Sequence, residues 1–264
     1  MSTVTSKDGT PIAYETLGSG PALILVDGAM CYRDFGPARG LAAALADTFT
    51  VYLYDRRGRG ESGNTLPSSE DREIDDLAAV LTAAGGEAAL LGTSSGAVLA
   101  ADAAAKLPGI TRLALYEPPF IVDKTREPRE ESFVPDTEAM IARDDRSGAL
   151  KKFMKHVGMP AAMVHIMALT PPWKKLKAVA PTLPYDLHIL GDTGRGVPLD
   201  PARWSAVGVP ALVMDGGKSP QYMRNAARAL SEALPKAEYR TIPGQTHIIK
   251  ATALAPSIKQ FLAA

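Results

Sequence analysis

The stretch Ala88-Ala89-Leu90-Leu91-Gly92-Thr93-Ser94-Ser95-Gly96 decides the fold of this chain. Its first four residues form a short apolar run typical of a buried strand, and an alanine-rich helical pattern follows over Ser95–Lys106. Glycines two positions before and two positions after Ser94 let the backbone turn sharply from strand to helix without a Cβ clash. In this context the stretch predicts a nucleophilic serine, whereas in a loop it would be an ordinary glycine-rich turn.

Ser94, and not Ser95, occupies the centre of this G-x-S-x-G pattern. At such a turn the serine backbone is strained and the hydroxyl projects from the sheet. The amino terminus of the following helix favours the negative charge that develops on a carbonyl oxygen under attack. The small residues that would let this helix pack closely on the sheet are Ala97, Ala100, Ala101 and Ala104.

Short apolar runs and helical patterns alternate along most of the chain, which predicts a mostly parallel sheet with helices on both faces. An antiparallel hairpin is expected first, with strands at Thr3–Ser6 and Pro11–Leu17. Buried strands are expected at Ala22–Val26, Phe49–Tyr54, Ala88–Leu91, Ile110–Tyr116, Ala211–Met214 and Glu238–Ile242. Helices are expected at about Pro37–Ala46, Ser69–Ala84, Ser95–Lys106, Pro220–Leu234 and Pro256–Leu262.

The alternation stops between residues 123 and 200, where Pro, Met, Lys and His are frequent and no good strand run occurs. We expect residues 123–200 to form a helical cap, inserted after the sixth strand into a core made of residues 1–122 and 201–264. A disordered linker is the alternative for Val122–Pro135, which is charged and carries two prolines. Gly191–Gly196 is expected to be a loop, because no convincing βαβ unit precedes it.

The composition limits the classes of protein to which the chain can belong. Its 264 residues suffice for one sizeable core, and a formal net charge of +0 provides no global field toward nucleic acid or an anionic membrane. The single cysteine excludes an internal disulfide, and Met1–Thr10 carries no apolar signal segment. We expect a cytoplasmic protein with no nucleic-acid or membrane partner. The sequence does not indicate the oligomeric state.

His247 is the histidine placed to act as a base. It lies in Pro243–His247, directly after the last expected strand, from where it can reach over the sheet to the nucleophile. The other histidines fall in the cap and are interpreted as polar or pocket-lining residues: His156, His165 and His188.

These residues resemble the α/β-hydrolase superfamily, and the resemblance covers nearly the whole chain outside the cap. Asp55–Ser62 is similar to the D-x-R-G-x-G-x-S turn after the fourth strand of that family, where the turn is mainly structural. The resemblance implies an α/β-hydrolase fold with an eight-stranded, mostly parallel sheet. We find no metal-ligand spacing, phosphate-cradling glycine loop or dinucleotide fingerprint, so neither a metal nor a cofactor is expected.

The segment after the third strand departs from the family pattern. Many members have His-Gly there, and this chain has Asp27-Gly28. The resemblance implies that the backbone N–H groups of Ala29 and Ser95 form the oxyanion hole, and backbone donors do not depend on the side chain that changed. Asp27 itself is interpreted as bracing the loop.

The triad acid is the second departure. Ser219 occupies the place after the seventh strand where most members carry an aspartate. Glu117 ends the sixth expected strand, which is the alternative acid position in some haloalkane dehalogenases and in zearalenone lactonase; the latter also has Asp-Gly and paired serines at the elbow. We therefore expect Glu117 to be the acid that orients His247, and Asp215 is the reserve candidate.

The pocket is harder to predict. Met30 and Cys31 follow the oxyanion loop and are expected to line it, with Cys31 as a small apolar filler and not a reactive thiol. Four apolar cap residues are further candidates for an adaptable pocket wall, and the alternative is that they form the core of the cap: Met154, Met163, Met167 and Trp173. Six lysines without an acidic residue lie within residues 151–177, which favours a solvated helix face over a site for an anionic substrate.

A serine nucleophile suits acyl transfer, whereas the dehalogenases and epoxide hydrolases of this fold need an aspartate at the elbow. We expect a serine hydrolase that cleaves a largely apolar carboxylic ester or lactone through an acyl-enzyme intermediate. The alternatives are a cofactor-free perhydrolase, C–C hydrolase or lyase on the same site, and a small-molecule receptor with slow turnover.

Overall fold

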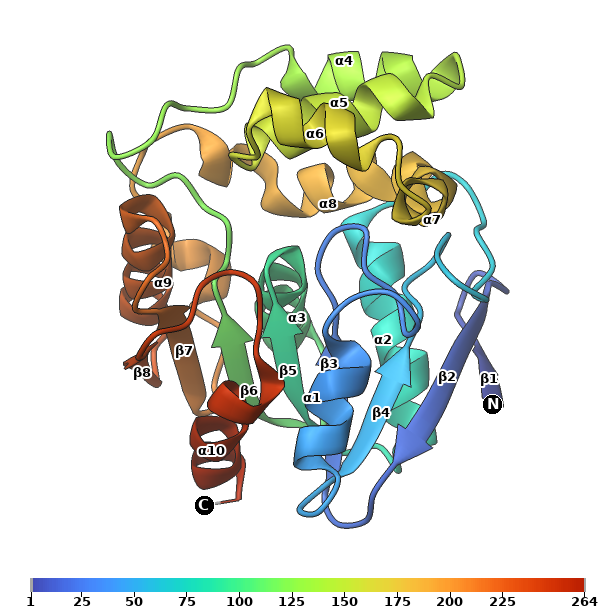
Figure 1. The fold of residues 1–264 in the computed structure, drawn as a ribbon. Helices are drawn as coiled ribbons and strands as arrows, with labels where there is room; N and C mark the ends of the chain where they lie inside the picture. Colours follow the sequence, from blue (N-terminus) through green and yellow to red (C-terminus); the bar gives the residue numbers. More distant parts are fainter. Residues whose placement is uncertain (1, 264) are drawn as a thin grey trace.

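A single twisted sheet forms the centre of the computed structural model, which describes residues 2–263 (Figure 1). Within these residues, eight strands lie in the order β1-β2-β4-β3-β5-β6-β7-β8. β2 pairs antiparallel with β1 and β4, and the other neighbours are parallel. The predicted fold is therefore confirmed, while positions 1 and 264 of the predicted core lie outside the described residues. The strands are β1 Ser2–Thr5, β2 Pro11–Leu17, β3 Ala22–Val26, β4 Thr50–Tyr54, β5 Ala88–Thr93, β6 Ile110–Tyr116, β7 Ala211–Gly216 and β8 Ala237–Ile242.

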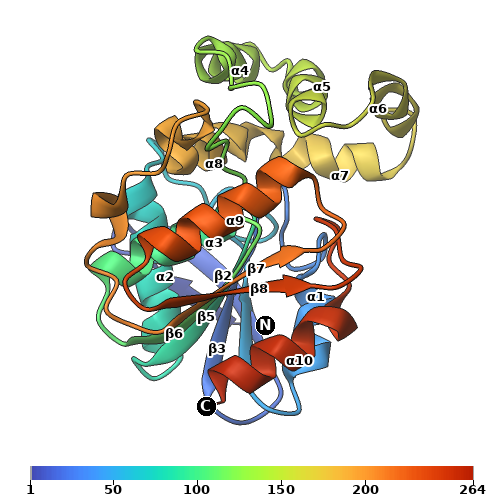
Figure 2. The same cartoon turned by 90° about the vertical axis from the view of Figure 1, so that its left-hand side faces the viewer.

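Apolar side chains cover both faces of the sheet, because successive residues of a strand point to opposite faces. Ile24 and Leu90 pack with the helices of one face, and Leu23 and Leu91 pack with those of the other. All four side chains are fully buried, so their strands lack a polar alternation. The helices on the first face are α2 Glu70–Ala83, α3 Ser95–Lys106 and α9 Gln221–Ala233, and those on the second are α1 Ala38–Leu45 and α10 Ala251–Leu262 (Figure 2).

Helix α10 begins five residues earlier than the sequence predicts. The expected start at Pro256 follows the preference of proline for the first turn, yet Pro256 lies inside the helix. An interior proline removes one backbone hydrogen bond and normally destabilises a helix. Leu254 and Ile258 are both fully buried in the layer shared with α1, and this packing on both sides of the proline outweighs the local preference.

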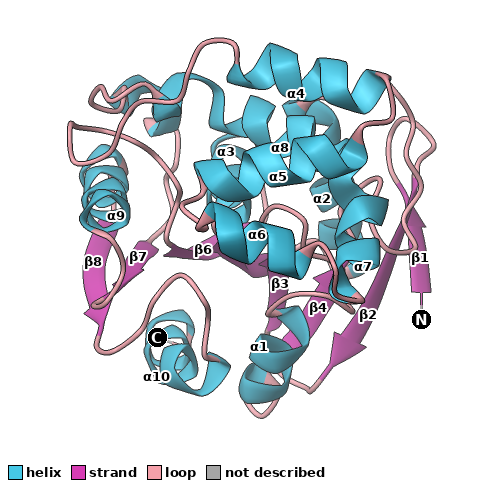
Figure 3. Cartoon of the chain, turned by 45° about the horizontal axis from the view of Figure 1, so that its top comes forward, coloured by secondary structure: helices cyan, strands magenta, loops and turns pink. Residues whose placement is uncertain are grey.

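A layer of helices lies over the carboxyl edge of the sheet, between β6 and β7 in the chain (Figure 3). These helices are α4 Phe133–Ala142, α5 Arg146–His156, α6 Ala161–Met167, α7 Pro172–Val179 and α8 Leu183–Leu190. They share an apolar cluster of their own around Leu150, Val164 and Leu183. The cap boundaries at residues 123 and 200 stay a prediction. Among residues 2–263, no helix is long and apolar enough to cross a membrane.

The segment between β6 and α4 is attached to the rest of the cap. The Arg129 N–H donates to the Gly194 carbonyl at 2.7 Å, and the Arg129 guanidinium donates to the Gly191 carbonyl. These bonds argue against the disordered-linker alternative for Val122–Pro135. The expectation of a loop at Gly191–Gly196 is wrong in its first part, because Gly191–Gly194 forms a 3-10 helix to which the segment binds.

Buried arginines of the Asp55–Ser62 turn join the cap to the sheet. Asp186 of α8 accepts from Arg56 Nη1 at 2.7 Å and from Arg59 Nη2 at 2.5 Å. Arg56 also forms two 2.6 Å bonds to Glu73 of α2. Burial alone would raise the pKa of Asp186, but the charges of Arg56 and Arg59 outweigh burial and hold that pKa below its ordinary value. The turn therefore has the structural role that the resemblance implies.

We predict that Asp186→Asn lowers the free energy of unfolding by about 3 kcal/mol, because two buried guanidinium groups lose the carboxylate they share. Urea unfolding at neutral pH measures this loss. Asp136→Asn is the matched control in the cap, since its pair with Lys152 is on the surface and such pairs contribute about 1 kcal/mol or less. Equal losses of unfolding free energy in the two variants would contradict a stabilising role for the buried ion pairs of Asp186.

Candidate active site

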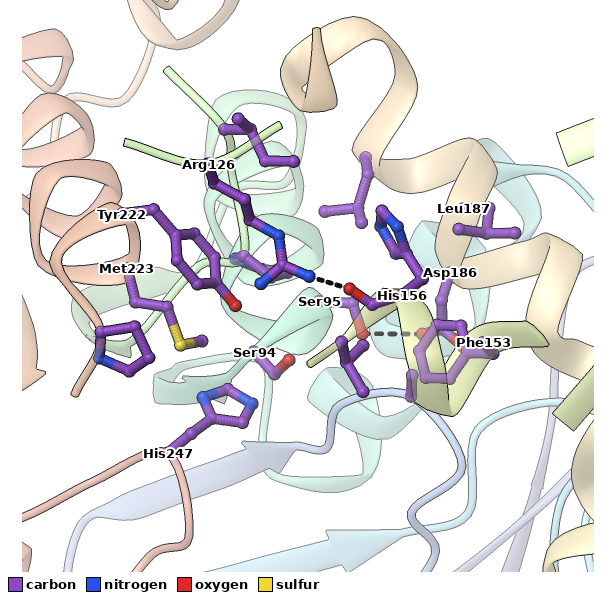
Figure 4. A pocket seen from close by; sticks show the side chains of 16 residues that line it. Ser94, Ser95, Arg126, Phe153, His156, Asp186, Leu187, Tyr222, Met223 and His247 are labelled. Atoms are coloured by element: carbon purple, nitrogen blue, oxygen red, sulfur yellow. Dashed lines mark hydrogen bonds between the residues drawn. The ribbon is translucent and has the colours of Figure 1, made fainter. Parts of the chain in front are cut away.

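Ser94 stands at the turn between β5 and α3 in a strained backbone conformation. Its φ of 55° and ψ of −127° lie in a region that residues other than glycine rarely adopt. The Ser94 N–H donates to the Tyr116 carbonyl of β6 at 2.9 Å, which holds the turn in place. The hydroxyl is thereby presented to the space between sheet and cap (Figure 4).

Three glycines let the chain pack tightly around this turn. A Cβ on Gly96 would lie 2.1 Å from the Val26 carbonyl oxygen, and one on Gly92 would lie 2.5 Å from the Gly96 carbonyl oxygen. A Cβ on Gly28 would lie 2.8 Å from the Ser94 Cβ. Because a Cβ cannot approach a neighbour this closely, the start of α3 and the loop after β3 can meet at Ser94 only with glycine at these positions.

The buried Glu117 pairs with the solvent-accessible His247 beside this turn. Glu117 directly follows β6 with a φ of 49°, and its side chain has no exposed surface. Its Oε1 accepts from the Gly216 N–H at 2.7 Å, and its Oε2 lies 2.8 Å from His247 Nδ1. The structure thus brings together the glutamate and the histidine that the sequence singles out, from the ends of β6 and β8.

The loop that carries His247 is anchored next to the nucleophile. The Tyr116 hydroxyl donates to the Thr246 carbonyl at 2.7 Å, which ties the residue before His247 to the end of β6. Figure 4 shows the imidazole beside the Ser94 hydroxyl, and both side chains line the same two cavities. Ser94, His247 and Glu117 therefore lie in a row at the carboxyl edge of the sheet.

Asp215, the reserve acid, is engaged elsewhere. Its Oδ2 accepts from the Tyr239 hydroxyl at 2.5 Å and from Arg224 Nε at 3.2 Å. The side chain is fully buried, with its partners on β8 and α9, and no hydrogen bond or ion pair joins it to His247 within residues 2–263. Ser219, which stands at the usual acid position, has a buried hydroxyl with no hydrogen-bond partner in the described part of the chain.

Two of the cavities meet at Ser94. One has a volume of about 160 Å³ and extends from Ala29 and Ser95 toward α9, where Tyr222 and Met223 line it. The other has a volume of about 420 Å³. It extends toward the start of α1 and the loop after β8, and its lining includes Gly28, Ala29, Met30, Cys31, Pro37, Ile248 and Ile249. The predicted oxyanion residues Ala29 and Ser95 thus border the space in front of Ser94, and Met30 and Cys31 line its larger branch.

The four cap residues predicted as pocket wall are placed elsewhere. Met154 and Trp173 are buried in the apolar cluster of the cap, and Met167 packs against that cluster. Met163 points outward and is 57% exposed. None of the four lines either cavity at Ser94, because three of them pack in or against the core of the cap and Met163 faces solvent. The prediction of these four as pocket residues is corrected accordingly.

The cap and α9 contribute other residues that the sequence analysis did not assign to the site. Phe153 and Val157 line both cavities, and Arg126 and Asp186 line the smaller one. His156, which the sequence analysis interpreted as polar or pocket-lining, also lines the smaller cavity. Ser95 Oγ donates to Asp186 Oδ1 at 2.8 Å, which links the residue after the nucleophile to the cap. No local motif marks these positions, because their placement depends on how the cap packs on the core.

The loop after β3 contains a buried acid, Asp27, near a partly buried thiol, Cys31. Burial raises the pKa of Asp27 to about 7, although Arg59 and Arg56 lie near enough to oppose that rise. Burial, with the nearby Asp27 as the next cause, raises the pKa of the Cys31 thiol to about 12. Cys31 therefore stays protonated at neutral pH and is a poor nucleophile, as expected of an apolar filler.

A family model described as "Alpha/beta hydrolase family" matches residues 20–256 of this chain. The chain belongs to the alpha/beta hydrolase family. An alpha/beta hydrolase from Sphaerobacter thermophilus has a similar structure, with 45% identity, coverage of 98% of this chain and 99% of that chain, and a TM-score of 0.90. Membership of the family supports an enzyme of the hydrolase type.

More distant members have known structures with the same fold. A thermophilic esterase from Thermogutta terrifontis is 21% identical over 99% of this chain and 97% of that chain, with a TM-score of 0.72. The enol-lactonase from Burkholderia xenovorans is 21% identical over 100% of both chains, with a TM-score of 0.70. At this level of identity, the similarity shows the fold that this alpha/beta hydrolase shares with them.

We predict that Asp27→Asn changes the pH dependence of stability in a defined direction. The unfolded carboxyl ionises near its ordinary pKa of 3.8, while the folded one ionises at about 7, so the wild-type protein loses stability as pH rises through this window. Asp27→Asn removes that loss. The free energy of unfolding of the variant, relative to that of the wild type, should rise by up to ~4 kcal/mol between pH 4 and 7 and stay constant above pH 7.

Urea unfolding across this pH range measures the difference between the two proteins. Glu87→Gln is the control, because Glu87 is exposed and its profile should follow the wild type. A difference between Asp27→Asn and the wild type that does not vary with pH would refute the raised pKa.

Proposed function

We propose that this alpha/beta hydrolase is a serine hydrolase that cleaves a carboxylic ester or lactone through an acyl-enzyme intermediate. The observation that carries the proposal is the 2.8 Å contact between the buried Glu117 and His247 Nδ1, beside a serine held in a strained turn. A base oriented by an acid and set next to a hydroxyl is the arrangement that activates a serine for attack.

Each residue has one role in the proposed reaction. Ser94 Oγ attacks the carbonyl carbon while His247 Nε2 takes the hydroxyl proton, and Glu117 holds the other ring nitrogen and stabilises the imidazolium. The backbone N–H groups of Ala29 and Ser95 bind the oxyanion. His247 then gives its proton to the departing alcohol oxygen, and the acyl group stays on Ser94.

Water completes the cycle. His247 removes a proton from a water molecule as the water oxygen attacks the acyl carbon. The acyl bond to Ser94 breaks, the proton returns to Ser94 Oγ, and the carboxylic acid leaves. The substrate is a medium-sized, largely apolar ester or lactone, because most residues that line the two cavities are apolar.

The nucleophile is tested by covalent labelling with a fluorophosphonate. We predict labelling of the wild type at Ser94 and complete loss of labelling in Ser94→Ala, with hydrolysis of p-nitrophenyl esters reduced at least ~1,000-fold. Ser205→Ala is the control, because Ser205 is exposed and lies outside both cavities. Labelling that persists in Ser94→Ala would remove the nucleophile assignment.

The acid is tested by comparing two isosteric substitutions. Glu117→Gln should lower kcat for ester hydrolysis by ~100-fold to 10,000-fold, because the amide no longer stabilises the imidazolium. Asp215→Asn should change kcat less than ~10-fold, since Asp215 bonds Tyr239 and Arg224 instead of His247. A large loss in Asp215→Asn together with full activity in Glu117→Gln would reverse the assignment.

A further inference from the structure

The smaller cavity at Ser94 contains an arginine for which the proposed reaction has no role. Arg126 lies in the segment between β6 and α4, and Figure 4 shows its guanidinium reaching toward the space in front of Ser94. Apart from Asp186, the residues that share this cavity are apolar, aromatic or neutral polar groups. A guanidinium at this place is a fixed positive charge beside the reacting bond, because arginine stays protonated in proteins.

Arg126 has no acidic partner in the part of the chain that the structure describes. Within residues 2–263, no carboxylate lies within 4.0 Å of its guanidinium, in contrast to Arg56 and Arg59. Its contacts are a hydrogen bond to the His156 carbonyl and a position over the Tyr222 ring, with Cζ 4.3 Å from the ring centre. These contacts hold the side chain in place, while most of its five N–H donors have no acceptor among the described residues.

The carboxylate that shares the cavity does not neutralise this charge. Asp186 is engaged by Arg56, Arg59 and Ser95. Burial, followed by the charges of nearby arginines, lowers the pKa of His156 to about 4. The imidazole is therefore neutral at pH 7 and does not alter the net charge that Arg126 gives to the cavity.

Positive side chains extend from this point to the surface. A third cavity adjoins the smaller cavity at Arg126 and His156, and its charged lining residues are Arg126, Glu127, Glu130, Lys151, Lys152 and Lys155. Lys152 is paired with Asp136 of α4 at 2.5 Å. Lys151 and Lys155 have no ion-pair partner within the described chain, and they offset the charges of Glu127 and Glu130 in the same lining. Arg126 is therefore the uncompensated positive charge of this lining.

We propose that Arg126 binds a carboxylate group of the substrate, so that this enzyme prefers esters or lactones that carry one negative charge near the cleaved bond. The inference rests on the proposed function, since it assigns the substrate class of the same site. The carboxylate-bearing part lies in the smaller cavity of about 160 Å³. The apolar part lies in the larger cavity, toward Met30 and Ile248. Arginine suits this role because its planar donors match the geometry of a carboxylate.

The proposal is tested with two pairs of substrates, each made of a charged ester and a neutral ester of similar size. 4-Nitrophenyl hydrogen glutarate and 4-nitrophenyl hexanoate differ in charge on the acyl side. 4-Carboxyphenyl butyrate and phenyl butyrate differ in charge on the alcohol side. We expect kcat/KM of the wild type to favour the charged member of at least one pair, and Arg126→Met to lower this preference by about tenfold to a hundredfold.

Arg143→Met is the matched control. Arg143 is an exposed cap arginine that lines neither cavity at Ser94, and its nearest acid is Asp145 at 3.9 Å. Arg143→Met should keep the wild-type preference for the charged ester. Methionine retains the apolar stem of Arg126 over Tyr222, and urea unfolding checks that Arg126→Met is folded. An unchanged preference for charged esters in a folded Arg126→Met would overturn the proposal. Arg126 would then have only a structural role, through its contacts with α5 and α9.

A binding measurement separates this inference from the proposed function. Monomethyl glutarate should bind Ser94→Ala in calorimetry, and binding should weaken by about tenfold or more in the double variant Ser94→Ala with Arg126→Met. If the wild type hydrolyses neither pair but this difference in binding is found, the proposed function fails and the anion site stands. If both proteins bind monomethyl glutarate equally, the anion site is wrong whatever the enzyme hydrolyses.

Discussion

The close approach of β3 and α3 at the nucleophile turn is the constraint on which the site depends. The first turn of α3 lies against the carbonyl groups at the end of β3, and a Cβ on Gly96 would lie only 2.1 Å from the Val26 oxygen. This contact sets the start of α3 beside the loop after β3, so that Ala29 and Ser95 border one space. The strain at Ser94 persists because the surrounding sheet holds the turn on both sides.

Two buried acids, Asp186 and Glu117, organise the polar groups on either side of this turn. Arg56 and Arg59 share Asp186, and Asp186 in turn accepts from Ser95 Oγ, so the cap is bonded to the residue after the nucleophile. On the other side, Glu117 is buried at the end of β6 and directed at His247 by a bond from the Gly216 N–H. Removing either acid would leave buried positive or polar groups without a partner, which couples the stability of the fold to the order of the site.

The cap determines what reaches Ser94. Its large apolar residues serve its own core, since short helices must bury one side against each other. The residues that face the cavities instead come from the ends of helices and from the segment before α4, including Phe153, Val157 and Arg126. As a result, one branch of the site is apolar and the other has a guanidinium, a polarity that composition alone does not suggest.

The sequence by itself determined the order of the core strands and helices and the turn at Ser94, because apolar periodicity and glycine spacing are local signals. Glu117 as the partner of His247 came from the family resemblance, which kept Asp215 in reserve. The sequence pattern misplaced the start of α10, where buried Leu254 and Ile258 outweigh the preference of Pro256. Only the tertiary structure decided that Asp215 turns toward Tyr239 and that Met154 and Trp173 lie in the cap core. It also decided that Arg126 reaches the space at Ser94. These contacts join residues far apart in the chain, and their geometry is set by packing between elements, which no local pattern of residues encodes.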